Sequence, residues 1–324
     1  MKRKWIVSGL IALLLLVALL SFDRQSLLAS INQVPIWLIL LLLGLQIFSQ
    51  LLINYQWYQI TKMINISLSF WNIFQVNCQG AVMEAITPGV KVGGEITRAW
   101  QISRIAKCSK KQGAAVVAIQ KLFSLSALLI ILLVVVAYLT REGIWIFTRN
   151  MQVLSYSILL LFLLLFFSIF LFSDQLSTLL SAKKFARFFG LDKVQQFLLV
   201  LLEYVGYLSK SKNQLVALFL LSLFIWILYP IKMYFLAIQF YPEVQFADLS
   251  AITFAAYMVA MIPIFPGGLG GFEGSMSSLL FKLGFLMNDA IVITIFFRFS
   301  TFWFVLLFSL LFVILARISK NKTI

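Results

Sequence analysis

The residues best suited to chemistry lie in two short segments that share one pattern. Residues 88–95 are PGVKVGGE and residues 266–273 are PGGLGGFE, so both fit P-G-x-x-x-G-x-E. Proline ends a helix because it lacks an N–H, and glycine permits a tight reversal of the chain. A helix starting near each glutamate presents free N–H groups and its positive dipole end, which suits an anion. In a membrane, phosphate is the obvious anion.

A basic residue follows each segment within an apolar run. Lys121 comes 26 positions after Glu95, and Arg298 comes 25 positions after Glu273. We interpret the two stretches, residues 66–140 and 247–317, as the units of an internal repeat within one domain, 1–324. Paired helix interruptions in inverted repeats are typical of a transporter site at the membrane midplane.

The predicted site is a polar cleft for a lipid headgroup. Its residues are Glu84, Pro88, Gly89, Gly93, Gly94, Glu95, Arg98, Lys121, Pro266, Gly267, Gly268, Gly270, Gly271, Glu273 and Arg298. We predict no catalytic residue, no metal ligand and no cofactor, because histidine is missing and no nucleotide-binding or metal-binding motif is found.

Each charged candidate has a plainer structural interpretation. Glu95 and Glu273 would favour the first turn of a helix as caps alone. Arg98 would serve as a surface anchor or as an i,i+3 partner of Glu95. Lys121 lies near the start of its span and would extend to the surface. These alternatives stay open at this point.

The sequence favours a functional role for Arg298. This residue lies eight residues inside an apolar run, where a charge is costly and faces a cavity or a partner. Lys232 and Lys282 are also in or beside apolar runs. We expect both to extend their ammonium groups to the membrane surface.

The composition determines which elements must position these residues. Of 324 residues, 62% are hydrophobic and only 11% are charged, and the mean hydropathy is +1.01. Soluble domains contain about 25% charged residues, and β-barrels show short alternating segments instead of long apolar runs. The sequence therefore predicts an all-α polytopic membrane protein with about six to eight transmembrane helices, two of its segments being re-entrant.

The expected spans follow from the apolar runs. They are an uncleaved first span at residues 5–20, then 35–60, 114–139, 154–172, 215–240 and 290–316, with shorter apolar pieces at 68–87, 249–265 and 275–286. A cleaved signal peptide is the alternative for the first run. Residues 183–208 predict an amphipathic helix at the interface.

The basic residues predict the orientation. The net charge of +15 gathers at the ends of apolar runs, which is the positive-inside pattern and not a nucleic-acid-binding patch. The two termini and residues 91–111 and 183–212 are expected in the cytoplasm, and residues 241–248 outside. Arg141 and Arg149 are minor exceptions to this assignment.

Three stretches resemble a known family. ITPGVKVGGEITRAW, IPIFPGGLGGFEG and FRFSTFW are similar to the transmembrane region of lysylphosphatidylglycerol synthases, also found as stand-alone flippase-like membrane proteins. The resemblance implies a bacterial or archaeal plasma-membrane protein linked to translocation of a phospholipid or polyprenyl-type lipid. We expect the soluble synthase domain to be absent, because the chain ends soon after its last span.

One departure concerns the third span. Many relatives have a Glu-Arg pair there with an acid shortly after, where this chain has Gln120, Lys121 and Ser124. Lysine keeps the charge but lacks the fork that fits phosphate in two places.

Two classes of function remain. One is a lipid translocator that binds an anionic phospholipid or polyprenyl phosphate and needs no soluble donor. The other is a membrane-embedded aminoacyl or glycosyl transferase, or an accessory subunit of one. The chain is more simply explained as a translocator, because no positioned base or donor site is visible. A regulatory or scaffold role, a homo-oligomer and a partner enzyme stay open.

Overall fold

The computed structural model describes residues 24–87, 92–141, 149–181, 192–262 and 268–321. Within these ranges the chain forms helices joined by short connections, and no strand is found there. Pro88, Gly89, Pro266 and Gly267, together with the expected first span at residues 5–20, lie outside the described residues.

The helices follow one another with short connections. In chain order they are α2 (Arg24–Asn32), α3 (Ile36–Met63), α4 (Phe70–Ile86), α5 (Val92–Ile105), α6 (Lys110–Arg141), α7 (Arg149–Leu171), α8 (Ser173–Ser181), α10 (Asp192–Ser209), α11 (Lys212–Ala237), α12 (Phe246–Ala260), α13 (Gly271–Lys282), α14 (Met287–Arg298), the π-helical segment η2 (Phe299–Trp303) and α15 (Phe304–Asn321).

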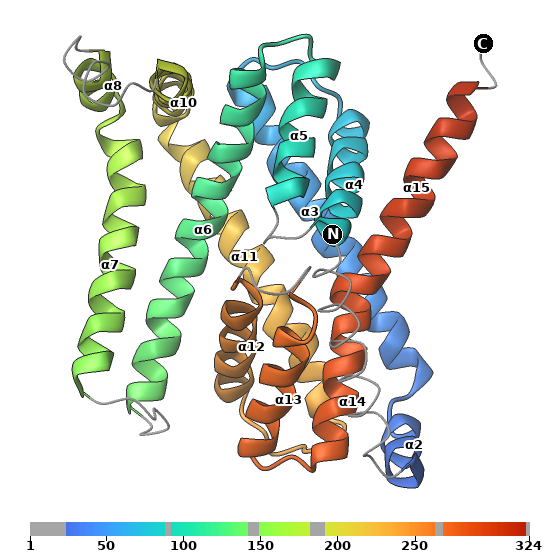
Figure 1. The fold of residues 1–324 in the computed structure, drawn as a ribbon. Coiled ribbons are helices and arrows are strands. Elements are labelled where there is room, and N and C mark those ends of the chain that lie inside the picture. The colour runs from blue at the N-terminus through green and yellow to red at the C-terminus, as the bar shows by residue number, and fades with distance from the viewer. Residues whose placement is uncertain (1–23, 88–91, 142–148, 182–191, 263–267, 322–324) are drawn as a thin grey trace, which may run out of the picture.

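Five helical stretches of the described chain are long and apolar enough to cross a membrane. They are Ile36–Met63, Lys110–Arg141, Gln152–Leu171, Lys212–Ala237 and Met287–Ala316, the last running through α14, η2 and α15. Each contains or overlaps an expected span, so the prediction of an all-α polytopic membrane protein is confirmed. Figure 1 shows these helices side by side, with the connections gathered at the two ends of the bundle.

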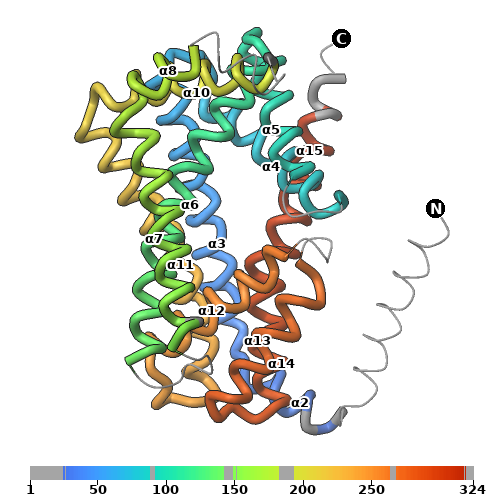
Figure 2. The backbone as a smooth tube through the Cα atoms, turned by 60° about the vertical axis from the view of Figure 1, so that its left-hand side comes forward, coloured from blue at the N-terminus to red at the C-terminus, as the bar shows by residue number. Residues whose placement is uncertain are grey.

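Four shorter helices form two pairs inside this frame. α4 and α5 lie side by side in the upper half of the bundle, while α12 and α13 lie side by side in the lower half (Figure 1). The end of α4 and the start of α5 lie toward the middle of the molecule, as do the end of α12 and the start of α13, and Figure 2 shows the same separation from another side. The two pairs thus approach the middle from opposite ends of the bundle.

The buried core follows this division into halves. One apolar cluster joins α3, α6, α10 and the first part of α11, around Ile119 and Leu208. A second joins the later part of α11 to α12, α13 and α14, around Met276 and Phe297. α7 exposes its apolar residues almost all round, which suits contact with lipid tails. The amphipathic helix expected at 183–208 corresponds to α10 over its described part.

Glycine lets α4, α5 and α6 approach closely. A Cβ at Gly94 would lie 2.8 Å from the carbonyl oxygen of Gly80, and a Cβ at Gly113 would lie 2.3 Å from that of Ala99. Neither oxygen can move without its helix. Small residues of this kind are what allow helix backbones to pack tightly in membranes.

We expect Gly94→Ala to destabilise the protein by about 1–3 kcal/mol, because overpacking pushes α5 away from α4. Gly44→Ala is the matched control, since a Cβ there meets nothing within 4 Å. Thermal unfolding in detergent should show a clearly lower Tm for Gly94→Ala and an unchanged or slightly raised Tm for Gly44→Ala. Equal effects of the two substitutions would contradict the close contact.

Candidate functional site

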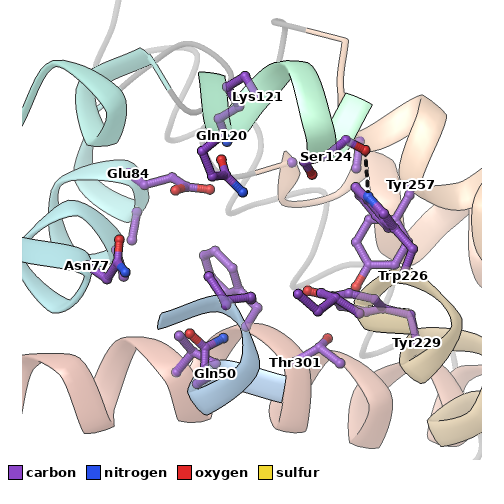
Figure 3. A pocket seen from close by; sticks show the side chains of 18 of the residues that line it. Gln50, Asn77, Glu84, Gln120, Lys121, Ser124, Trp226, Tyr229, Tyr257 and Thr301 are labelled. Atoms are coloured by element: carbon purple, nitrogen blue, oxygen red, sulfur yellow. Dashed lines mark hydrogen bonds between the residues drawn. The ribbon is translucent and has the colours of Figure 1, made fainter. Parts of the chain in front are cut away.

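A cavity of about 240 Å³ lies where the two helical pairs face each other in the middle of the bundle. Residues from α3, α4, α5, α6, α11, α12, α14, η2 and α15 line it, and Figure 3 shows ten of them labelled. Its wall is mixed: amide, hydroxyl and charged groups occupy part of it, and Ile53, Ala81, Val305 and Leu306 form an apolar part.

The first charged cluster joins α4, α5 and α6 at this cavity. Arg98 donates to Glu95 at 2.9 Å and to Glu84 at 3.3 Å. Lys121 Nζ lies 2.7 Å from the same Glu95 oxygen. The Arg98 side chain is only 11% exposed, so a network and not a surface anchor holds it. Four predicted site residues, two acids and two bases, are thereby brought together.

The second charged cluster pairs α13 with α14. Arg298 Nε donates to Glu273 Oε1 at 2.9 Å. The other oxygen of Glu273 accepts the backbone N–H of Gly270 at 2.7 Å, so the carboxylate caps α13 as well. The Arg298 guanidinium also lies over the rings of Phe272 and Phe302, at 4.9 and 4.2 Å. These contacts fix the arginine at the cavity wall.

A π-helical turn follows Arg298 directly. Residues Phe299–Trp303 have this widened geometry, and Thr301 and Phe302 within them line the cavity. Single π-turns inside α-helices are rare and occur frequently at functional sites. Here the wider turn brings a hydroxyl and an aromatic ring to the same wall as the arginine.

The described glycines of the two repeated segments have different surroundings. Gly93 approaches Thr87, and Gly94 packs on Gly80, both within the α4–α5 pair. Gly268 and Gly270 have positive φ values of 72° and 84°, which residues with a Cβ rarely adopt, and Gly268 lines the cavity. Gly271 is the first residue of α13. The described glycines thus serve close packing in the first segment and positive-φ backbone in the second, and Gly93 and Gly271 are the equivalent pair among them.

Several residues that line or support the cavity were not predicted as site residues from the sequence. Gln56 donates to Ser222 at 2.5 Å and accepts from Gln120 at 3.2 Å, and Asn77 donates to Asn54 at 2.8 Å. The available signal was the run of amide side chains on α3, an otherwise apolar helix, where polar groups face the bundle interior.

Aromatic rings complete the wall. Trp226 donates its indole N–H to the backbone oxygen of Ser124 at 2.9 Å, drawn as the dashed line in Figure 3. The rings of Tyr229 and Tyr257 meet edge to face with centroids 5.1 Å apart. Their sequence positions gave no indication of this role, because aromatic residues occur throughout the chain.

The expectation for Lys232 is wrong. Its side chain is fully buried and donates to Gln46 and Ser49 of α3, so it does not extend to the surface. Polar partners on a neighbouring helix offset the cost of burial, which the apolar sequence around Lys232 does not reveal. Lys282, at the end of α13, is exposed.

The sequence profile of the family described as "Lysylphosphatidylglycerol synthase TM region" matches residues 5–309, which is nearly the whole chain. The chain belongs to this family. All the residues of both charged clusters fall within the matched part.

Archaeal proteins are among the relatives of this family member. A UPF0104 membrane protein of Pyrococcus horikoshii is 26% identical over 285 residues, which cover 82% of this chain and 83% of the relative. One from Methanothermobacter thermautotrophicus is 24% identical over 266 residues, 78% of each chain. One from Methanocaldococcus jannaschii is 25% identical over 251 residues, 74% and 73% of the two chains.

Proposed function

We propose that this member of the lysylphosphatidylglycerol synthase TM-region family moves anionic lipids between leaflets. The observation that supports this best is one cavity with a basic side chain from each half of the bundle, Arg98 from α5 and Arg298 from α14. The headgroup would lie between them while the acyl tails stay in the bilayer. An anionic phospholipid and a polyprenyl phosphate share the phosphate chemistry that this site would recognise.

The fold supports an inverted repeat of two re-entrant hairpins, α4–α5 and α12–α13. In this proposal the first hairpin enters from the cytoplasm with both termini on that side, and the second enters from outside. Irregular backbone at membrane depth is tolerated where protein or a wet cavity surrounds it. Both helical pairs border the same cavity, because Glu84 of α4 and Tyr257 of α12 line it together. Such an arrangement suits alternating access around a fixed site.

The electrostatics suit a transient anion. Arginine has five N–H donors arranged in a fork, which match phosphate oxygens in two places. Glu84, Glu95 and Glu273 contact these bases at the cavity. A phosphate that enters competes with the carboxylates for the same donors. This exchange of anions would keep binding weak enough for release.

The alternative of a membrane-embedded transferase needs a nucleophile and a positioned base. The carboxylates at the cavity are each in contact with a basic side chain, and Glu273 also caps a helix. These contacts favour a structural and electrostatic role over acid–base catalysis.

Reconstitution of the purified protein tests the proposal. We expect liposomes that contain it to expose inner-leaflet, headgroup-labelled phosphatidylglycerol to a membrane-impermeant quencher, without any soluble donor. Empty liposomes and liposomes with heat-denatured protein should lose only the outer-leaflet signal. Chemical conversion of the lipid without movement would support the transferase, and neither movement nor conversion would contradict translocation.

A further inference from the structure

A second ionisable site lies one layer behind the cavity wall, at Lys232 of α11. Its side chain is 0% exposed. It is placed in the later part of a spanning helix, between the cavity and the second apolar cluster. Charged residues buried at membrane depth are rare, and they commonly mark ion or proton pathways.

The partners of this ammonium group are all neutral. Nζ donates to Gln46 Oε1 at 2.5 Å and to Ser49 Oγ at 3.1 Å, and it lies 4.6 Å from the centre of the Tyr229 ring. Among the residues that the structure describes, no carboxylate is within ion-pair distance of it. A change of its protonation therefore changes the charge of this region by a full unit, with no acid in contact to compensate.

Polar groups connect Lys232 with the cavity. Tyr229, whose ring faces Nζ, lines the cavity, and so does Gln50, which follows Ser49 in α3. Gln46, Gln50 and Asn54 recur at helical spacing along one face of α3. The Gln46 Nε2 donor is buried and has no partner in the described structure. An unpartnered donor beside an ammonium group marks a polar spot inside the bundle, where apolar packing is otherwise the rule.

Several charged and titratable side chains of the helices around α11 have partners other than Lys232. On α12, Tyr257 contacts Tyr229 and Asp248 accepts from Tyr138. On α14, Asp289 accepts from Ser30 and Arg298 pairs with Glu273. On α6, Lys121 pairs with Glu95. Tyr204 of α10 packs near Leu218, in the first part of α11, and the face of α3 that contacts Lys232 offers only Gln46 and Ser49.

We propose that Lys232 is a reversible proton-binding site that couples lipid movement to a proton gradient, an inference that rests on the proposed function. In one step an N–H bond of the ammonium breaks, the electron pair stays on the amine nitrogen, and the proton passes to water in the cavity. In the reverse step the amine lone pair takes a proton from water on the other side of the membrane. The balance is one proton bound and one released in each cycle.

The backbone of α11 near Lys232 contains a position at which a change of charge could bend the helix. Pro230 lies inside α11 and cannot donate to the carbonyl four residues earlier, that of Trp226. Helices bend most readily at such positions. Trp226 and Tyr229, which precede Pro230 within the same turn of α11, both form part of the cavity wall. A change of charge at Lys232 would thus alter the packing of the helix that shapes the cavity.

The test compares lipid movement in liposomes for the wild type, Lys232→Met, Lys232→Arg and the control Lys212→Met. Lys212 is an exposed lysine at the start of the same helix. We expect the rate of lipid movement in the wild type and in Lys212→Met to change by up to about tenfold per pH unit over the pH range in which Lys232 titrates. Both Lys232 variants should be flat across that range, because one has no titrating amine and the other stays charged.

A gradient experiment separates coupling from simple pH sensitivity. An imposed difference of about two pH units, which could at most shift a one-proton equilibrium about 100-fold, should change the steady-state distribution of labelled phosphatidylglycerol in the wild type. It should leave the Lys232→Met distribution unchanged. A wild-type distribution that ignores the gradient, or equal pH profiles in wild type and Lys232→Met, would overturn the proposal.

Thermal stability, which can be measured without lipid movement, distinguishes a failure of the translocator proposal from a failure of the proton-binding site. The Tm difference between wild type and Lys232→Met in detergent should vary with pH if the lysine titrates in the folded protein. A protein that moves no lipid but shows this variation would refute the translocator and keep the proton-binding site. A Tm difference that stays constant with pH would refute the site itself.

Discussion

Arg298→Gln is expected to lower lipid movement at least about tenfold, since a lost charge-assisted hydrogen bond alone amounts to about 1.5–3 kcal/mol. Its effect on folding should be smaller than its effect on transport. Glu273 keeps the bond from the Gly270 N–H in this variant, and its side chain is 28% exposed, so water can solvate it. Transport assays and thermal unfolding, normalised to the amount of reconstituted protein, measure the two effects.

Removing the acidic partner of Arg298 should affect folding more than removing Arg298 itself. Glu273→Gln removes the carboxylate that contacts Arg298 at 2.9 Å while the arginine stays charged and 7% exposed. Breaking a buried pair in this way typically costs about 3–5 kcal/mol, so both folding and transport should suffer. The double variant should be more stable than Glu273→Gln alone, because no positive charge is left behind.

Lys282→Gln is the matched control, because it removes an exposed positive charge from α13. It should leave both readouts near the wild-type values. Additive effects of the two single substitutions, or wild-type transport by Arg298→Gln, would show that the pair is structural and that the site lies elsewhere.

Arg98→Gln is expected to destabilise the protein about as strongly as Glu273→Gln. Arg98 contacts two carboxylates and is 11% exposed, so its removal leaves Glu84 and Glu95 sharing a smaller positive charge. By the range for broken buried pairs, the free energy of unfolding should fall by about 3–5 kcal/mol.

Arg104→Gln provides the comparison for this substitution. Arg104 is an exposed base in the last turn of the same helix, where its guanidinium lies over the ring of Trp100. Its substitution should change Tm by no more than a surface charge does, about 0.5 kcal/mol in unfolding free energy. Similar Tm values for the two variants would contradict the central role of Arg98.

Much of the fold was predictable because its physics is local. Apolar runs of sufficient length must form helices in a bilayer, since each backbone polar group needs an internal partner. The chain therefore showed the positions of α3, α6 and α11 to within a few residues. That Arg298 faces a cavity or a partner was anticipated as well, because a charge inside an apolar span requires one, and Glu273 is that partner.

The site contacts that could not be predicted from the sequence join segments that are far apart in the chain. No local rule says that Gln56 meets both Ser222 and Gln120, which come from three helices. Lys232 looked like a surface lysine, because only the tertiary fold sets Gln46 and Ser49 beside it. The surroundings of Gly93, which approaches Thr87, and of its equivalent Gly271, the first residue of α13, were equally hidden, because the shared motif does not reveal them.

The balance of charge at the cavity has a consequence for the membrane potential. The first cluster contains two acids and two bases, and the second contains one of each, so these six side chains sum to zero. A carrier with neutral walls acquires the charge of its cargo, and a monoanionic headgroup makes the loaded form one unit negative. Each 100 mV across the bilayer then acts on that form with about 2.3 kcal/mol, driving the lipid toward the positive side. A proton moving in the same direction on Lys232 would cancel that charge and make the movement insensitive to voltage.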